Sequence, residues 1–209
     1  MMLIELFAPR GVLDDAQRKR LSEQLATEVM AADGIPDEVM ERGRAMAWLL
    51  VHEPELWTIG GQPTDLLGGP RYVVRVSVPG GHITDGMRGE LIERITRVLA
   101  EDSDDPQRLY DEPYAWVHVI ELPDGNAGAF GQIMRTSDIM QLIVKGVKPG
   151  GDDQAVEQAA ATVVDPICGM TVALTADAIT LEHEGVTYGF CSPICRDMFA
   201  DQQRSATAA

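Results

Sequence analysis

The chain lacks any apolar run that approaches the length of about 20 residues needed for a membrane-spanning helix. It also shows no secretory segment before its first strand-like run. Positive charge is scarce, with 17 Lys and Arg against 33 Asp and Glu, for a net charge of −16. This balance repels phosphate backbones, and no basic cluster offsets it. We therefore expect neither membrane insertion nor nucleic-acid binding.

Cysteine is also rare, with 3 among 209 residues. An odd number of cysteines without a secretory segment predicts free thiols in the reducing cytoplasm. At this length, 45% of hydrophobic residues is enough for one medium-sized hydrophobic core and a second, smaller one.

All three cysteines lie in the last quarter of the chain, at Cys168, Cys191 and Cys195, with the spacing C-x22-C-x3-C. Thiolates are soft ligands that suit zinc and Cu(I). Cys191 and Cys195 stand one helical turn apart if the segment CSPIC opens a helix. A hairpin of residues 179–183 and 186–190 would return the chain toward Cys168. The pattern favours a metal site, with simple packing of buried cysteines as the alternative.

The motifs DPICGM, TYGFCS and PICRDMF within residues 163–201 resemble a YHS domain, a family related to the TRASH metal-handling modules. The resemblance implies that Cys168, Cys191 and Cys195 hold Cu(I) or Zn(II). Structural zinc normally takes four protein ligands, so a fourth would come from His183, Met170, a carboxylate or an outside donor. Three thiolates alone suit Cu(I). A YHS domain without metal stays the alternative.

The rest of the chain repeats itself. Strand-like, helical and strand-like runs at 2–8, 15–32 and 45–52 return at 72–78, 84–101 and 115–122. A shift of 70 residues places Pro9 on Pro79, and a shift of 68 places Trp48 on Trp116. A duplicated β-α-β unit predicts a four-stranded sheet with two helices on one face. With the hairpin-and-helix cysteine module, the predicted fold class is α+β.

We predict four segments. Residues 1–145 form the repeat domain, with repeats at about 2–60 and 71–130, and its residues 139–147 pack on it as a closing helix or strand. Residues 146–162 form a linker, 163–201 the YHS-like domain, and 202–209 a disordered tail.

The tandem repeat, together with FAPRG, IGG and NAGAFG, resembles the tautomerase superfamily, in particular the macrophage-migration-inhibitory-factor type. The resemblance implies a homotrimer. It also implies a pocket with Arg10 as a carboxylate binder and Trp116 and His118 from a neighbouring subunit. A solvated loop arginine, a core tryptophan and a surface histidine are the alternatives for these three residues.

Catalysis is where the sequence departs from that family. Tautomerases use an amino-terminal proline as the general base, and the matching position here is Met2. Met2 and Arg10 are therefore the catalytic candidates, and the sequence leaves open whether the chain is an enzyme.

Three functional hypotheses follow. The first is a metal-binding protein on a trimeric tautomerase-like scaffold, in metal handling or sensing. The second is a tautomerase or isomerase of a small keto-enol acid that works without the usual proline. The third is a non-catalytic interaction scaffold whose C-terminal module docks a protein partner.

Overall fold

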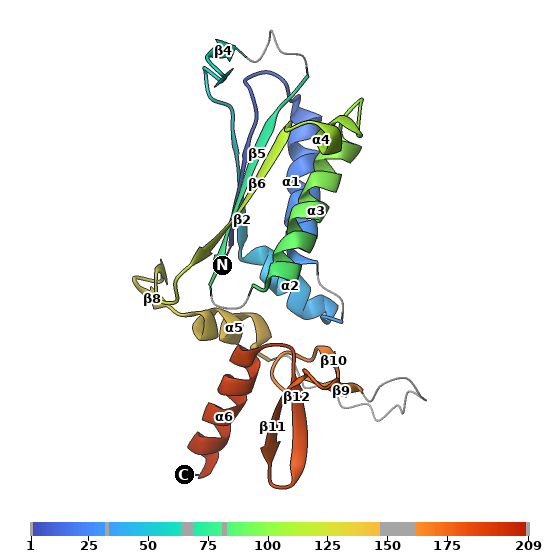
Figure 1. The fold of residues 1–209 in the computed structure, drawn as a ribbon. Helices are drawn as coiled ribbons and strands as arrows, with labels where there is room; N and C mark the ends of the chain where they lie inside the picture. The colour runs from blue at the N-terminus through green and yellow to red at the C-terminus, as the bar shows by residue number, and fades with distance from the viewer. Residues whose placement is uncertain (1, 32–33, 64–68, 81–82, 147–161, 208–209) are drawn as a thin grey trace. The chain divides into compact units, whose positions relative to one another are not determined.

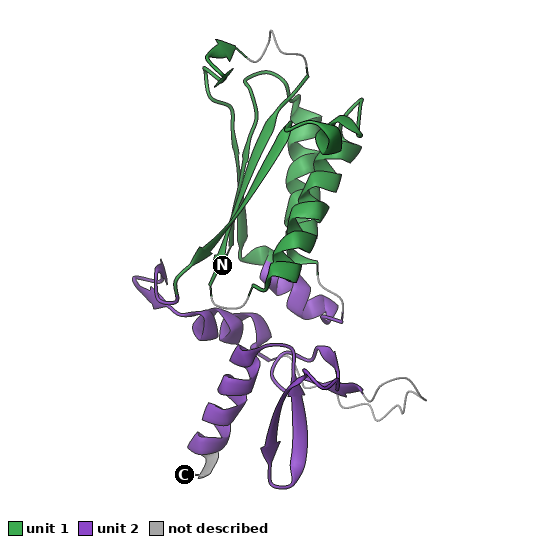
Figure 2. Cartoon of the chain, in the orientation of Figure 1, with its two compact units in different colours: residues 1–31, 44–123 green, residues 32–43, 124–209 purple. Residues whose placement is uncertain are grey.

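A computed structural model describes residues 2–31, 34–63, 69–80, 83–146 and 162–207 (Figure 1). The fold is α+β, as predicted. Two compact units make up the chain (Figure 2). We call Met1–Ala31 with Arg44–Pro123 the repeat unit, and Ala32–Gly43 with Asp124–Ala209 the cysteine unit. Most of the predicted linker, residues 147–161, lies outside the described residues.

The repeat unit contains a four-stranded sheet in the order β2-β1-β5-β6. Its strands are β1 (Met2–Phe7), β2 (Ala47–His52), β5 (Tyr72–Pro79) and β6 (Ala115–Leu122). β1 runs parallel to β2 and β5 parallel to β6, while β1 and β5 are antiparallel. Each repeat thus supplies one parallel pair, which confirms the predicted sheet of two β-α-β units.

Two long helices, α1 (Asp15–Met30) and α3 (Asp85–Glu101), lie side by side on one face of this sheet (Figure 1). α1 begins with a capping box, in which the Asp14 side chain accepts from the Gln17 N–H at 2.7 Å. Apolar residues at helical spacing face the sheet, as the sequence predicts. The fully buried part of this core contains Ile4, Leu6, Leu21, Leu25, Val74, Val76, Ile95 and Leu99.

Short elements connect these parts. They are α2 (Asp37–Ala45), β3 (Thr58–Ile59), β4 (Gln62–Pro63) and α4 (Arg108–Asp111). The second strand begins at Ala47, two residues later than predicted, because α2 continues through Ala45. No helix in the described part of the chain is both long and apolar enough to span a membrane.

The cysteine unit holds the remaining elements: β7 (Ala127–Ala129), β8 (Gln132–Met134), α5 (Thr136–Val144), β9 (Thr162–Val164), β10 (Thr171–Ala173), β11 (Ile179–His183), β12 (Val186–Phe190) and α6 (Pro193–Thr207). The predicted hairpin is β11–β12. Its turn at Glu184-Gly185 has φ values of 50° and 80°, a left-handed conformation that suits a two-residue loop.

The prediction of a disordered tail from residue 202 is wrong as far as Thr207, because α6 continues to that residue. The segment contains no Gly or Pro to stop a helix, and Arg204 forms an ion pair with Asp201 one turn earlier. Residues 208–209 lie outside the described residues.

The division into units differs from the predicted domains, which placed residues 124–145 with the repeats. Met140 and Val144 of α5 pack instead in the core of the cysteine unit, with Ile167 and Phe199. Residues 32–43 belong to the same unit, where the Arg42 guanidinium donates to the Ile143 carbonyl at 3.4 Å. The apolar face of α5 therefore completes the cysteine core.

Candidate metal centre

Cys168 lies in a short closed loop, residues 165–170, between β9 and β10. The Asp165 N–H donates to the Met170 carbonyl at 2.8 Å, and the Gly169 N–H donates to the Asp165 carbonyl at 2.9 Å. Gly169 has φ +77°, and a Cβ there would lie 3.2 Å from Pro36. The loop conformation thus needs glycine at this position, and it fixes the direction of the Cys168 side chain.

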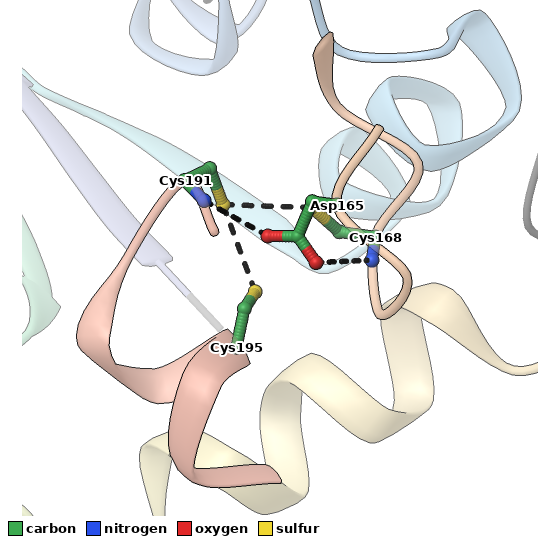
Figure 3. Close-up of side chains that lie close together, drawn as sticks. All are labelled: Asp165, Cys168, Cys191 and Cys195. Carbon is green, nitrogen blue, oxygen red and sulfur yellow. Dashed lines mark hydrogen bonds between the residues drawn. The ribbon is translucent and has the colours of Figure 1, made fainter. Parts of the chain in front are cut away.

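The Asp165 side chain links this loop to the second cysteine segment (Figure 3). It is fully buried, and its Oδ1 accepts the N–H groups of Ile167 at 2.8 Å and Cys168 at 3.4 Å. Its Oδ2 accepts the Cys191 N–H at 2.9 Å. Burial raises the pKa of the Asp165 carboxyl, while the N–H groups of Cys191 and Ile167 oppose that rise. A single carboxylate therefore holds two backbone segments that are 26 residues apart.

The other two cysteines lie where strand β12 gives way to helix α6. Cys191 directly follows β12, and Cys195 is in the first turn of α6. The Ser192 hydroxyl accepts the Cys195 N–H at 3.3 Å, as an N-cap side chain does. The helix start thus presents Cys191 and Cys195 toward the Cys168 loop, as the predicted one-turn spacing requires.

The three sulfur atoms converge on one point (Figure 3). The Cys191 Sγ lies 3.5 Å from the Cys168 Sγ and 3.6 Å from the Cys195 Sγ. These distances exceed a disulfide bond of about 2.05 Å, and all three cysteines are free. Tetrahedral zinc with Zn–S bonds of about 2.3 Å places its sulfur ligands about 3.8 Å apart. The sulfur spacing therefore fits a shared metal ion.

Asp165 completes the cluster, because its carboxylate and the three sulfurs lie within 4.8 Å of one another. His183, a predicted fourth ligand, does not belong to this group; its ring packs edge-on against Phe199 at a centroid distance of 6.1 Å. The sequence suggested a carboxylate without naming Asp165. The signal was the pair Asp165-Pro166, because an Asp before Pro commonly binds the N–H two residues on.

Protons are shared unevenly among the thiols. Hydrogen bonding with Cys191 lowers the pKa of Cys168 to about 3. The hydrogen bond to Cys168, together with burial, raises the pKa of Cys191, and the neighbouring Cys168 thiolate, together with burial, raises the pKa of Cys195. The cluster thus carries one negative charge easily, and two further thiolates require a compensating cation.

Arg10 lies elsewhere, in the repeat unit. It lines a hollow of about 620 Å³ together with Trp57, Pro70 and neighbouring loop residues. Its guanidinium is 3.3 Å from the Glu55 carboxylate, and both side chains are largely exposed. Met2 lies at the opposite end of β1, where its N–H donates to the Met46 carbonyl at 3.3 Å.

Trp116 and His118 do not line this hollow. Both project from β6 on the face of the sheet opposite α1 and α3, and Trp116 is 60% exposed, so it is not a core residue. Within one chain, the predicted pocket residues therefore lie at separate places. A pocket that uses all three requires a neighbouring subunit, as the family resemblance implied.

No protein-family model matches the chain, and no curated protein matches it. Several solved structures are similar. The crystal structure of Pt0534 inactivated by 2-oxo-3-pentynoate shares 22% identity, covering 63% of this chain and 94% of that chain, with a TM-score of 0.49. A fused 4-OT described as a wild-type asymmetric trimer shares 20% identity over 63% and 94%, with a TM-score of 0.48. Macrophage migration inhibitory factor from Toxoplasma gondii shares 16% over 63% and 99%, with a TM-score of 0.45.

Proposed function

We propose that the chain binds one soft metal ion, Cu(I) or Zn(II), through Cys168, Cys191 and Cys195, and serves in metal handling or sensing. The observation that carries the proposal is the approach of the three sulfurs, at 3.5 and 3.6 Å, from two distant segments of the chain. On this interpretation, residues 163–201 are a YHS-like module and the repeat unit is a tautomerase-like scaffold.

The surroundings of the sulfurs favour a soft ion. Cys195 is fully buried and Cys168 is 4% exposed, so few waters compete as ligands. The start of α6 places the positive end of a helix dipole beside two of the thiolates. The Asp165 oxygens already accept three N–H groups, which leaves coordination mainly to sulfur. Three thiolates suit Cu(I), whereas zinc would need a remaining Asp165 lone pair or an outside donor as fourth ligand.

Metal uptake tests the proposal directly. The reduced protein is loaded anaerobically with Cu(I) or with Zn(II), freed of excess metal by gel filtration and analysed for metal content. We expect about one ion per chain for at least one metal. His183→Ala is the matched control and retains the ion, because His183 lies outside the cluster. If the wild-type protein retains neither metal, the proposal fails.

Binding should release protons. The raised pKa values of Cys191 and Cys195 mean that both are thiols at neutral pH in the metal-free protein. Coordination needs thiolates, so we expect about two protons to leave per ion near pH 7, and the affinity to fall as the pH decreases. Calorimetric titration in buffers of different ionisation enthalpy measures this number. A binding heat that does not depend on the buffer would contradict the prediction.

A tautomerase activity is the second candidate, and the hollow beside Arg10 favours it. A guanidinium there can bind the carboxylate of a small keto acid with two parallel hydrogen bonds. We expect Arg10→Ala to lower any turnover of phenylpyruvate by about tenfold or more, because hydrogen bonds between charged groups contribute about 1.5–3 kcal/mol. Lys19→Ala, on the exposed side of α1, is the control. Equal rates for Arg10→Ala and wild type would exclude this pocket.

The exposed face of the sheet supports the proposed homotrimer. Trp48 on β2 and Trp116 on β6 are 66% and 60% exposed, and Leu50 and Ile120 are also exposed on these two edge strands. Exposed tryptophans are typical of a protein–protein interface. The fused 4-OT structure is likewise described as a trimer. Sedimentation equilibrium of the full chain distinguishes a trimer from a monomer.

A further inference from the structure

Cys191 occupies the central place in the cysteine cluster. Its sulfur contacts both of the others, at 3.5 Å to Cys168 and 3.6 Å to Cys195 (Figure 3). Cys168 and Cys195 flank it, and the whole group spans up to 4.8 Å. A disulfide bond is about 2.05 Å long. The Cys191 sulfur is therefore close enough to form a disulfide with either neighbour after a small movement.

Cys191 is also the cysteine that solvent reaches. It is half-buried, whereas Cys168 and Cys195 are almost fully buried. It lies between the last residue of β12 and the first residue of α6, outside both elements. Its backbone is therefore free of the hydrogen-bond ladders of either element and can adjust as a disulfide forms, apart from the N–H bond to Asp165.

We propose that the cluster is a site of reversible oxidation by small hydroperoxides, and that each disulfide formed there includes Cys191. The inference does not depend on which sulfur reacts first. Oxidised Cys168 or Cys195 has Cys191 as its touching neighbour, and oxidised Cys191 has either of the other two.

The chemistry balances with hydrogen peroxide as the oxidant. One sulfur attacks the O–O bond, an S–O bond forms, and the first water leaves, which gives a sulfenic acid. The neighbouring thiol then attacks that sulfur, an S–S bond forms, the S–O bond breaks, and a second water leaves. Two thiols lose two electrons and two protons in total, and the peroxide is reduced to two waters. A thiol reductant reverses the change by exchange.

This oxidation goes beyond the proposed metal binding and needs no metal. It removes two of the three sulfur ligands at once, so an oxidised cluster retains one thiol. The same residues thus have a second state in which the soft-metal site no longer exists.

Mapping the remaining thiol tests the proposal in the wild-type protein. The full-length, metal-free, reduced chain is treated with hydrogen peroxide, labelled with N-ethylmaleimide and analysed by tandem mass spectrometry. We expect the loss of two of the three thiols, with the label on Cys168 or Cys195. A label mainly on Cys191, or no loss of thiols, would overturn the proposal. Because the chain remains metal-free, this result is separate from any failure of metal binding.

Single variants provide a second test. Cys168→Ser and Cys195→Ser each keep one touching pair and should still form a disulfide within the chain. Cys191→Ser loses both touching pairs, so disulfide formation should slow by about tenfold or more, because the reacting sulfurs are no longer held in contact. Equal rates for all three variants would contradict the proposal. Circular dichroism confirms that each variant is folded, and the wild-type mapping stands without them.

Discussion

Replacing Cys195 with serine should weaken metal binding by about 10²- to 10³-fold, the largest effect that we expect. Binding of structural zinc contributes about 10–16 kcal/mol over four ligands, so loss of one ligand costs about 2.5–4 kcal/mol. Serine is nearly isosteric, but its hydroxyl stays protonated and is a poor ligand for a soft ion. Competition with a chromophoric chelator measures the affinity.

The Cys195 variant has a matched control on the same helix. Ser205 is exposed on α6 and its hydroxyl donates to the Asp201 carbonyl at 2.9 Å, far along the helix from its first turn. Ser205→Ala should bind the ion as the wild type does. If Cys195→Ser binds as tightly as Ser205→Ala, then Cys195 is packed in the core and is no ligand.

Asp165→Asn should destabilise the metal-free protein by about 2–4 kcal/mol, because its carboxylate accepts three buried N–H groups. An asparagine has one acceptor oxygen, so its NH₂ group must face an N–H in either orientation. The two cysteine segments then lose their link, and metal affinity should also fall by about 10–100-fold. Chemical denaturation of the metal-free chain measures the first effect and chelator competition the second.

Asp177→Asn is the control for Asp165, because Asp177 is exposed in the same unit. A surface substitution of this kind should change the free energy of unfolding by less than about 0.5 kcal/mol. If Asp165→Asn lowers the metal affinity but leaves the stability of the metal-free protein unchanged, then Asp165 is a direct ligand. That result would contradict the role of its carboxylate in holding the two cysteine segments together. Unchanged stability and affinity would contradict both roles.

The sequence predicted the parts of the fold that depend on local patterns. Leu21, Leu25 and Val29 recur at helical spacing and are buried on α1, and the Glu184-Gly185 turn has the left-handed backbone that its residues favour. The duplicated β-α-β pattern likewise predicted the four-stranded sheet with two helices on one face. These features follow from periodicity and turn chemistry within short segments.

Long-range features were harder to predict. The apolar residues of 139–147 predicted a closing element, but periodicity does not show which core that element packs against, and Met140 packs in the cysteine unit. Asp165 is a similar case, because its role depends on the N–H of Cys191, 26 residues away. The approach of the three cysteines was easier to predict, because a shared metal ion requires sulfur ligands from distant segments to lie close together.

The most direct test of the central claim is X-ray absorption spectroscopy of the metal-loaded protein, which counts the sulfur atoms bound to the ion. We expect three sulfur scatterers for Cu(I), or three sulfurs with one oxygen or nitrogen for Zn(II), at a distance of about 2.3 Å for zinc. A first shell made only of oxygen and nitrogen would contradict the proposal that Cys168, Cys191 and Cys195 share one ion.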